Sequence, residues 1–519
     1  MKKETISADV VVVGYGLAGA VAAVTAHDAG VKVVIVEKAV HFGGNSILSG
    51  GGVLCVDDPE KAVQYFDALC GGRTGPDVIQ AQATMMSKTE DYLRHLCKIN
   101  GATLSKRGRH GIYPFPGKDG INSVTVDEVP SFEGYRWLLA LSGGVVEVPG
   151  SEGHRWLSAL SGGARLMKVM EDNVNARRIE VVMSTTTKDL LTDAGGAVTG
   201  VVGERDGKKI VFNSRRAVVL ACGGFEHNEK LKLQFLEGSP YYSMAPLTHT
   251  GDGIIMSMKL GASLWHMWHV HGSYGFKYPD FPIAFRSRID GARDPYPHRP
   301  HYIKMRWIVV DQSGKRFMNE YPPAPQDTPH RPLSYFDPDL PGHPRIPSYL
   351  IFDEPARREG PMSRPMGLRD TAYQWSKDNS KEIERGWIIK ADTLADLASK
   401  INVPSDNLKV TVERWNKGVE TGKDLDFGRP AGTMFSPIET PPYYAMEAWP
   451  IIVNTQGGPE HNAKQQVMHV SGTPIPRLYA VGEIGSMFGH IYELGGNLGE
   501  CVSSGRIAGE NAAEEKPSC

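Results

Sequence analysis

The sequence has 519 residues, which is too long for one ordinary hydrophobic core and predicts two domains or one large domain that a second one interrupts. It has 57 Lys and Arg against 59 Asp and Glu, a balance that excludes the basic surface of a nucleic-acid-binding protein or of a polybasic membrane protein. Its six cysteines form no C-x-x-C pair, which excludes a haem attachment motif and a zinc knuckle. With no apolar stretch of membrane-spanning length, we expect a cytoplasmic protein with reduced thiols and a small-molecule partner, without nucleic acid or membrane.

The N-terminal segment has the pattern of a dinucleotide-binding βαβ unit. Residues 10–13 are a continuous β-branched run, typical of a strand buried on both faces, and the sequence G-Y-G-L-A-G follows directly. Gly14 allows the tight turn, Gly16 lets the backbone approach a pyrophosphate, and Gly19 lets helix and strand pack closely. A helix-forming stretch comes next, and then a second buried strand that ends at Glu37. Glu37 is therefore placed to accept hydrogen bonds from ribose hydroxyls.

The segment after this unit favours FAD over a nicotinamide nucleotide. Residues 41–52 combine glycines with small polar side chains, and we expect a loop that brings backbone and hydroxyl groups against the phosphate and ring of a large planar ligand. Residues 215–228 and 477–485 each predict a buried strand that ends in a glycine turn. Together with strands expected within residues 179–203, they fit the closing strands of a flavin-binding domain.

With these motifs in place, the chain resembles the flavoprotein family that includes fumarate reductases, urocanate-type reductases and 3-ketosteroid Δ1-dehydrogenases. The resemblance implies an α/β fold in which a Rossmann-like FAD-binding domain, residues 1–275 and 433–519, is interrupted by a smaller α+β capping domain, residues 276–432. It also implies non-covalent FAD. The residues that it assigns to the cofactor are Gly14, Gly16, Leu17, Ala18, Gly19, Glu37, Lys38, Gly44, Asn45, Ser46, Gly50, Gly51, Ala221, Gly223, Gly224, Asp252, Gly482, Glu483, Gly496, Asn497 and Leu498.

The expected cap is dense in proline between residues 279 and 347, which predicts loops that wrap a pocket rather than long regular elements. Residues 306–320 predict a hairpin that turns at Ser313–Gly314, and their G-K-R-F-x-N-E portion matches the family's cap motif. In fumarate reductases an arginine that serves as catalytic acid follows the N-E pair. Here residues 319–327 read NEYPPAPQD and contain no arginine.

Two further patterns receive no catalytic role. Residues 265–272 (WHMWHVHG) hold three histidines, but their spacing is not that of a helical ligand pair and no acidic ligand is near. We therefore expect an aromatic wall or plain core there, and no metal site. Residues 133–144 and 152–163 are near copies of each other, and Gly162–Gly163 at the end of the second copy are expected to open a helix.

The C-terminal stretch GHIYELGGNLGEC begins at Gly489 and carries the expected chemistry. Fumarate reductases hold a dicarboxylate with a histidine and an arginine, which would fall at Gly489 and Glu493; both are missing, and a glutamate repels a dianion at close range. The 3-ketosteroid Δ1-dehydrogenases carry G-H-x-Y-x-x-x-G, which residues 489–496 match. By this resemblance the Tyr492 hydroxyl and the Gly496 N–H hold the ketone oxygen of the substrate.

This pair of donors suits the removal of two hydrogens beside a carbonyl. Loss of the α-proton puts negative charge on the ketone oxygen, and each donor fixed there is worth roughly 3 kcal/mol by analogy with oxyanion holes. The β-hydrogen then leaves as hydride to flavin N5. The family uses a second tyrosine as base and a third to support it. Tyr113 in YPFPG matches the supporting tyrosine, and Tyr321 is the nearest candidate for the base.

The expected activity is an FAD-dependent dehydrogenase that introduces a C=C bond next to the carbonyl of a cyclic ketone and passes electrons to an external acceptor such as oxygen, a quinone or a dye. A 3-ketosteroid and a 4-oxocyclohexanecarboxylate both remain open as substrates, the second because Arg306 or Arg331 would bind its acid group. One alternative is a reductase of an enone or an unsaturated acid. Another is a non-catalytic electron-transfer flavoprotein subunit, against which the lack of haem and iron–sulfur motifs counts.

Overall fold

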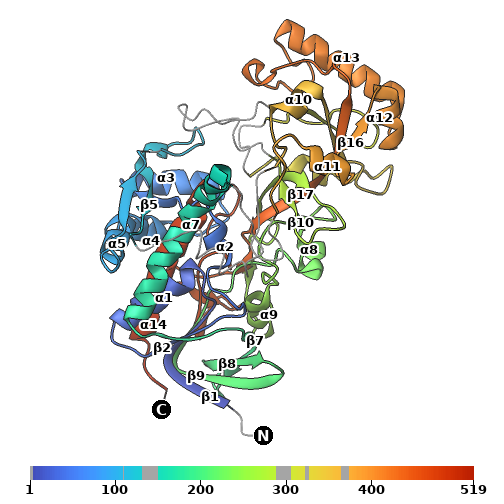
Figure 1. The fold of residues 1–519 in the computed structure, drawn as a ribbon. Helices are drawn as coiled ribbons and strands as arrows, with labels where there is room; N and C mark the ends of the chain where they lie inside the picture. The colour runs from blue at the N-terminus through green and yellow to red at the C-terminus, as the bar shows by residue number, and fades with distance from the viewer. Residues whose placement is uncertain are drawn as a thin grey trace. The chain divides into compact units, whose positions relative to one another are not determined.

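The computed structural model describes residues 4–108, 110–130, 150–287, 306–321, 327–363 and 373–518. The chain forms two compact units (Figure 1). Unit 1 consists of Met1–Asn228, Pro246–His269 and Asn454–Cys519, and unit 2 consists of Glu229–Ala245 and Val270–Val453. The segment expected to form the cap, residues 276–432, lies inside unit 2. Among the helices of the described ranges, none is both long enough and apolar enough to cross a membrane.

Unit 1 is built on an eight-stranded sheet with the order β19-β20-β9-β1-β2-β6, to which β8 and β7 are added beside β9. Its strands are β1 (Glu4–Val13), β2 (Val33–Val36), β6 (Glu180–Val182), β7 (Thr186–Thr192), β8 (Val198–Arg205), β9 (Lys208–Leu220), β19 (Gln466–Met468) and β20 (Pro474–Ala480). β1 pairs in parallel with β2 and β9, and β20 pairs in parallel with β9. The valines at 10–13 are buried, which confirms the predicted strand. Parallel pairing brings the carboxyl ends of these strands to one edge of the sheet, where ligands bind in such folds.

The helices of unit 1 are α1 (Leu17–Asp28), α2 (Gly44–Leu48), α3 (Pro59–Cys70), α4 (Pro76–Met86), α5 (Thr89–Cys97), α7 (Gly150–Ala176), α9 (Asp252–Lys259) and α14 (Gly496–Glu514), with the 3-10 turn η1 (Lys118–Gly120). Small sheets are formed by β3 (Val53–Val56), β4 (Thr103–Lys106) and β5 (Ile121–Glu128), and by β11 (Leu264–Trp265) and β18 (Gly458–Pro459). α1 packs closely against α14, because a Cβ at Gly505 or Gly509 would lie 2.8 Å from a backbone oxygen of α1. The N-terminal and C-terminal segments therefore form one domain (Figure 1).

Two expectations about local structure were wrong. Residues 41–52 are not a continuous loop, because α2 forms a short helix within them. Gly162–Gly163 do not open a helix but lie inside α7. The pair permits a close backbone contact instead: the Gly163 N–H donates to the Ser49 carbonyl at 3.0 Å, and a Cβ at Gly162 would lie 2.1 Å from the Gly50 carbonyl oxygen. The first near copy, residues 133–144, lies outside the described residues.

Unit 2 contains a seven-stranded sheet with the order β13-β12-β17-β15-β14, in which β10 and β16 also pair with β17. Its strands are β10 (Tyr242–Ser243), β12 (Val270–Phe276), β13 (Phe285–Arg286), β14 (Ile308–Val310), β15 (Ser348–Asp353), β16 (Ile389–Ala391) and β17 (Tyr443–Thr455). Its helices are α8 (Glu229–Phe235), α10 (Glu354–Glu359), α11 (Ser380–Glu384), α12 (Leu394–Lys400) and α13 (Ser405–Thr421), with the 3-10 turns η3 (Arg331–Ser334) and η5 (Ala431–Thr433). The described part of the proline-dense stretch holds only short elements, as predicted.

The G-K-R-F-x-N-E motif of unit 2 forms a buried ionic network. The predicted turn is present, since the Gly314 N–H donates to the Asp311 carbonyl at 2.9 Å, but its second arm is a single bridge at Arg316 rather than a strand. The Arg316 guanidinium lies 2.8 Å from the Glu320 carboxylate and 2.9 Å from that of Asp424. Buried charges of this kind require such partners. The motif therefore stabilises unit 2.

Candidate active site

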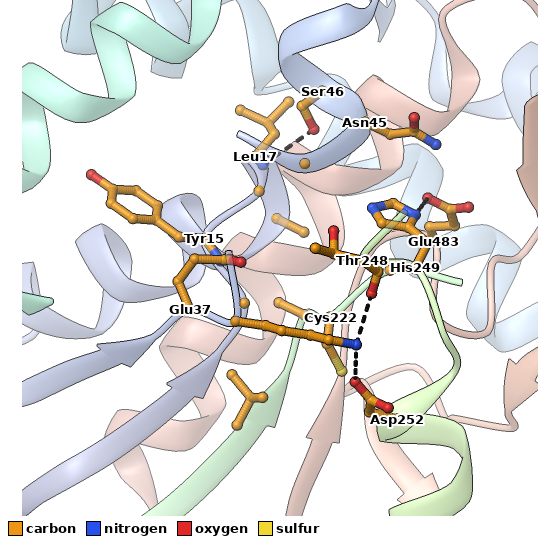
Figure 2. A pocket seen from close by; sticks show the side chains of 18 of the residues that line it. Tyr15, Leu17, Glu37, Asn45, Ser46, Cys222, Thr248, His249, Asp252 and Glu483 are labelled. Atoms are coloured by element: carbon orange, nitrogen blue, oxygen red, sulfur yellow. Dashed lines mark hydrogen bonds and ion pairs between the residues drawn. The ribbon is translucent and has the colours of Figure 1, made fainter. Parts of the chain in front are cut away.

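A pocket opens at the carboxyl ends of the parallel strands of unit 1 (Figure 2). The predicted cofactor residues that line it are Gly14, Gly16, Leu17, Ala18, Glu37, Lys38, Gly44, Asn45, Ser46, Ala221, Gly223, Asp252 and Glu483. The predicted residues that are not among its lining are Gly19, Gly50, Gly51, Gly224, Gly482, Gly496, Asn497 and Leu498. The sequence patterns missed Tyr15, Cys222, Thr248 and His249, which also line the pocket.

The first glycine turn has the geometry that its pattern predicts. Gly14 has φ +109°, its N–H donates to the Val36 carbonyl at 2.8 Å, and a Cβ there would lie 2.3 Å from the Ala221 carbonyl oxygen. No side chain other than hydrogen fits that position. At Gly16 the nearest atom to an added Cβ is the Ser46 Oγ at 3.8 Å, so the backbone there faces open space.

The N-terminus of α1 supplies an anion-binding surface at this turn. Its N-cap residue is Gly16, the first turn has no acidic side chain, and the Leu17 N–H donates to the Ser46 hydroxyl at 3.2 Å. Ser46 sits in α2, so the glycine-rich segment after Glu37 contacts the start of α1 directly (Figure 2). A helix N-terminus that is free of carboxylates favours the phosphates of a dinucleotide.

Glu37 ends the second strand and points its carboxylate into the pocket (Figure 2). Burial raises its pKa, and the two amides that donate to it oppose this effect. The donors are the N–H of Tyr15, at 2.7 Å from Oε2, and the N–H of Ala39, at 2.7 Å from Oε1. These bonds fix the carboxylate at the position expected for a ribose acceptor.

Lys38 and Asp252 form an ion pair at the pocket wall. The Lys38 Nζ lies 2.8 Å from the Asp252 Oδ2, and it also donates to the Thr248 carbonyl at 3.2 Å. The pair ties the end of β2 to the start of α9. Because Asp252 neutralises it, the Lys38 ammonium is not a free counter-charge for a phosphate.

The loop 489–496 presents Tyr492 beside the start of α14. Tyr492 is 7% exposed, and its hydroxyl oxygen accepts a hydrogen bond from the Gly495 N–H at 3.1 Å. The Tyr113 hydroxyl donates to the Tyr492 carbonyl at 2.9 Å, so the structure brings these two predicted residues together. The Gly496 N–H donates to the Glu493 carbonyl at 2.8 Å.

Glu493 occupies the position at which fumarate reductases carry a dicarboxylate-binding arginine. Here its side chain is buried and joins separate segments of unit 1. Its side chain is 1% exposed, and its carboxylate accepts hydrogen bonds from the Tyr65 hydroxyl, the Ile112 N–H at 3.3 Å and the Leu494 N–H at 3.0 Å. The Tyr65 oxygen in turn accepts from the Tyr113 N–H at 3.2 Å. Glu493 thus joins α3 and the YPFPG segment to the Tyr492 loop, a link that no sequence pattern indicated.

The histidines near Gly489 contact backbone carbonyls. The two nitrogens of His266 lie 2.8 Å from the Ser486 oxygen and 3.0 Å from the Arg73 oxygen, and the His269 Nδ1 lies 2.6 Å from the Phe488 oxygen. A Cβ at Gly489 would lie 2.9 Å from the His266 Nε2 and 2.8 Å from the Arg73 Cβ. No histidine therefore fits at position 489. The third histidine, His271, belongs to unit 2.

The remaining candidates belong to unit 2. Tyr321 is 2% exposed, and its N–H donates to the Asn319 side chain at 2.8 Å. Arg306 and Arg331, the candidates for binding a substrate carboxylate, already have carboxylate partners: Arg306 Nε lies 3.2 Å from Glu359 Oε2, and Arg331 Nη2 lies 3.2 Å from Asp327 Oδ2. In the family the base tyrosine lies a few positions after the N-E pair, where this chain has Ala324, and Ala324 is outside the described residues.

Comparisons with known proteins identify the family of the chain. A family model described as "FAD binding domain" matches residues 9–498. The 3-oxosteroid 1-dehydrogenase of Mycobacterium tuberculosis is 28% identical, with 98% of each chain covered. The 4-oxocyclohexanecarboxylate 2-dehydrogenase of Sinomonas cyclohexanicum is also 28% identical, over 97% of this chain and 92% of that protein.

The fold has a counterpart among solved structures. The 3-ketosteroid Δ1-dehydrogenase of Sterolibacterium denitrificans superposes with a TM-score of 0.78 at 23% identity, over 98% of this chain and 99% of that one. The glycine turn, the open helix N-terminus and Glu37 fit FAD. The chain therefore belongs to the FAD-binding-domain family of flavoproteins and is an FAD-dependent oxidoreductase.

Proposed function

We propose that the protein is a dehydrogenase that introduces a C=C bond α,β to the carbonyl of a cyclic ketone. The observation that carries this proposal is the Tyr492 phenol, which is fixed by the Gly495 N–H at the N-terminus of α14. Two relatives that align with nearly the whole chain are named as dehydrogenases of cyclic ketones. They are a 3-oxosteroid 1-dehydrogenase and a 4-oxocyclohexanecarboxylate 2-dehydrogenase.

Tyr492 is suited to stabilise negative charge on a ketone oxygen. Its oxygen accepts an N–H hydrogen bond from Gly495 at 3.1 Å, and a hydroxyl that accepts such a bond is a better donor to a ketone oxygen. The positive end of the α14 dipole adds to this effect. We propose the Gly496 N–H as the second donor. In the structure it donates a hydrogen bond to the Glu493 carbonyl, and an N–H can share its hydrogen between two acceptors.

The proton-abstracting base is proposed to be Tyr321, with Tyr113 as the tyrosine that supports it; Tyr113 also contacts Tyr492. The Tyr113 hydroxyl holds the backbone of Tyr492 at 2.9 Å, so it limits movement of the phenol. Held at the pocket by Glu37 and the N-terminus of α1, FAD would supply the acceptor for the β-hydrogen as hydride and the route for the electrons to an external acceptor such as oxygen, a quinone or a dye. The chain itself orients the ketone and supports the charge that develops on it.

Reduction of a dicarboxylate is disfavoured by two features of the loop. His266 and Arg73 occupy the space that a side chain at Gly489 would need, and Glu493 places a buried carboxylate in the loop itself. A dianionic substrate would lack the two cationic groups that hold it in fumarate reductases.

Between the two substrate types, the described residues favour a neutral ring ketone. A keto acid requires a cation for its carboxylate. Arg306 and Arg331 already bind Glu359 and Asp327, so an added carboxylate would have to displace a partner from either arginine. We therefore place a 3-ketosteroid-like ketone before 4-oxocyclohexanecarboxylate.

The test uses the colour of the bound flavin. Under anaerobic conditions, a saturated 3-ketosteroid is added to the purified holoprotein, and 4-oxocyclohexanecarboxylate is added to a second sample. Bleaching of the flavin absorbance by either compound supports dehydrogenation, and faster bleaching by the steroid supports the neutral ketone. If neither compound bleaches the flavin while fumarate reoxidises the reduced protein, the proposal is wrong.

The Tyr492→Phe variant tests the role of the phenol. It should retain FAD and lower the rate of bleaching by about a hundredfold, since one oxyanion donor is worth roughly 3 kcal/mol. Tyr335→Phe, a change at a 43% exposed tyrosine, is the matched control and should leave the rate unchanged. If the wild type and Tyr492→Phe bleach at equal rates, Tyr492 does not donate to the ketone oxygen and has a structural role only.

A further inference from the structure

An exposed aromatic side chain lies on the surface of unit 1, next to the loop that carries Tyr492. Trp268 is 38% exposed, and in the part of unit 1 that the structure describes no other Phe, Tyr or Trp is exposed to this degree. The Arg73 guanidinium carbon lies 5.2 Å from the centre of the Trp268 ring, and the centre of the His490 ring lies 5.3 Å from it. All three residues belong to unit 1, and we call them the Trp268 patch. The patch presents a planar ring with a cation over its face.

Backbone contacts fix the positions of the residues in the patch. Arg73 lies in the turn between α3 and α4, and its carbonyl oxygen is 3.0 Å from the His266 Nε2. His490 lies in the loop before α14, where a Cβ added at Gly71 would be 3.3 Å from the His490 Cβ. A surface that is held in this way loses little conformational entropy when a ligand binds, which favours binding.

A series of contacts joins the patch to the start of α14. The Trp268 ring stacks on the His269 ring with 5.4 Å between the two centres, and the His269 Nδ1 lies 2.6 Å from the Phe488 carbonyl oxygen. The Phe488 ring packs against Gly496, the first residue of α14, because a Cβ there would lie 2.6 Å from the Phe488 Cζ. Gly496 is also a residue that the family resemblance assigns to the cofactor. The patch is therefore the exposed end of a row of contacts that reaches the proposed flavin site.

The chemistry of the patch suits a planar electron acceptor that gains negative charge. Aromatic ligands stack on an exposed indole, and an arginine beside that indole stabilises an anion. Within the described ranges Arg73 forms no ion pair with a carboxylate, so the protein does not already neutralise its charge. Molecular oxygen is too small to need a stacking surface, and a protein partner needs an interface of about 1,000 Å² or more. These features favour a quinone over the other external acceptors.

We propose that the Trp268 patch binds a quinone-type electron acceptor. The quinone gains two electrons from the reduced flavin and two protons, one from the reduced flavin and one from water, and it leaves as the quinol while FAD returns to its oxidised form. The Trp268 ring orients the quinone, and Arg73 stabilises the negative charge on its oxygen before the protons arrive. The inference rests on the part of the proposed function in which FAD passes electrons to an external acceptor, and it does not depend on the ketone substrate.

Equilibrium dialysis of the oxidised holoprotein measures quinone binding without turnover. The two probes are menadione, which is neutral, and a naphthoquinone sulfonate, which carries a negative charge. We expect both probes to bind. The sulfonate should bind more tightly by about fivefold at low ionic strength, because Arg73 attracts it, and added salt should reduce this preference.

Reoxidation of the flavin measures the electron transfer itself. The flavin of the holoprotein is reduced by light and EDTA, without oxygen and without a ketone, so that a failure of the proposed substrate does not affect the result. The reduced protein is then mixed with menadione in a stopped-flow instrument, and the return of the flavin absorbance is recorded. The rate should reach a plateau as the menadione concentration rises, because a docking site saturates.

Two variants locate the quinone. Trp268→Leu removes the stacking ring and should raise the menadione Kd and the half-saturating menadione concentration by about tenfold. Arg73→Gln removes the charge and should abolish the preference for the sulfonate over menadione. Phe336→Leu and Arg358→Gln, at exposed residues of unit 2, are the matched controls and should bind both quinones as the wild type does.

Three results would overturn the inference. They are a wild type that binds neither quinone, a reoxidation rate that stays proportional to the menadione concentration, and a Trp268→Leu variant that equals the wild type in both measurements. If Trp268→Leu does not fold, Arg73→Gln decides the matter, because a preference for the sulfonate that persists in this variant places the quinone elsewhere.

Discussion

Glu500 provides a prediction whose magnitude follows from its surroundings. It lies in α14, is 1% exposed, and contacts the segment just before the Tyr492 loop: the Glu500 Oε1 accepts from the Met487 N–H at 2.6 Å, and the Oε2 lies 2.5 Å from the Ser486 Oγ. Burial raises its pKa from 4.5 to about 8, against the effect of these two bonds. In the folded protein it is therefore a neutral acid at pH 7. Glu500→Gln replaces it with an amide of the same shape, whose oxygen can accept from Met487 and whose NH₂ can donate to Ser486.

The sign of the effect follows from proton linkage. Between pH 4.5 and about pH 8 the unfolded chain releases the Glu500 proton and the folded protein keeps it, so the wild type loses stability as the pH rises. The loss is about 1.4 kcal/mol per pH unit, or about 5 kcal/mol over the whole window. The Glu500→Gln variant has no titrating group at this position, so its free energy of unfolding does not show this loss. With an unfolding entropy of about 2.1 cal/mol/K per residue, 5 kcal/mol corresponds to about 5 °C in Tm for a chain of 519 residues.

The assay is thermal unfolding of the holoprotein in excess FAD, followed by circular dichroism at pH 5 and pH 8. Between pH 5 and pH 8 the wild type loses about 4 kcal/mol of its free energy of unfolding, so the Tm of Glu500→Gln relative to the wild type should rise by about 3–4 °C between the two pH values. Glu510→Gln, at an exposed glutamate of the same helix, should show no such change. Because each variant is compared with the wild type at the same pH, any pH dependence of FAD binding cancels. A difference between wild type and Glu500→Gln that is equal at pH 5 and pH 8 would refute the raised pKa.

Three further outcomes are expected. Gly14→Ala should abolish FAD retention, because its Cβ would lie 2.3 Å from a backbone oxygen; flavin absorbance after purification measures this. In the control Gly432→Ala the added Cβ meets no atom within 4 Å, so this variant should retain FAD fully. Tyr65→Phe removes one donor from the buried Glu493 carboxylate and should lower the free energy of unfolding by about 1–3 kcal/mol, whereas an unchanged Tm would remove Glu493 from its anchoring role. The buried cysteines Cys55, Cys70, Cys97 and Cys501 have raised thiol pKa values and should react slowly with iodoacetamide at pH 8 until the protein is denatured. Rapid labelling of these four in the native protein would contradict their burial.

The sequence by itself determined the parts of the fold that depend on local chemistry. The valines at 10–13 predicted a strand buried on both faces, and the glycine spacing after them predicted the turn at Gly14 and the open backbone at Gly16. These predictions hold because a hydrophobic run and a positive φ are properties of neighbouring residues. The absence of a histidine at 489 was also visible in the sequence, but its physical reason, the space taken by His266, was not.

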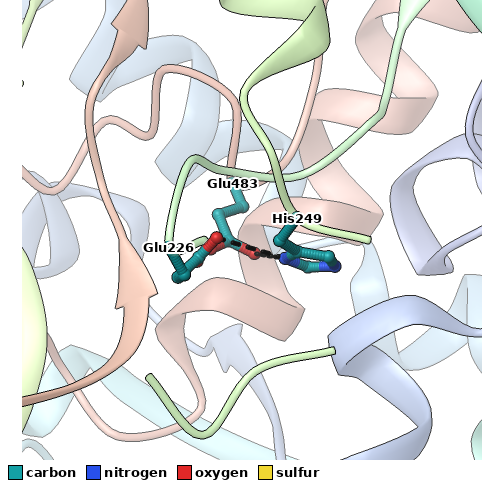
Figure 3. Close-up of side chains that lie close together, drawn as sticks. All are labelled: Glu226, His249 and Glu483. Carbon is teal, nitrogen blue, oxygen red and sulfur yellow. Dashed lines mark ion pairs between the residues drawn. The ribbon is translucent and has the colours of Figure 1, made fainter. Parts of the chain in front are cut away.

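Only the tertiary structure decided which distant side chains meet. Tyr65 and Glu493 are 428 positions apart, and no pattern in either segment indicated that they form a hydrogen bond. Glu226, His249 and Glu483 converge because β9 and β20 pair in parallel and end at the same edge of the sheet, with the segment before α9 beside them (Figure 3). Periodicity and spacing describe a segment by itself, whereas burial and charge at such a site depend on the pairing of strands that lie hundreds of residues apart. The glycine turns that line the pocket were therefore visible in the sequence, and the burial and charge around them were set by the fold.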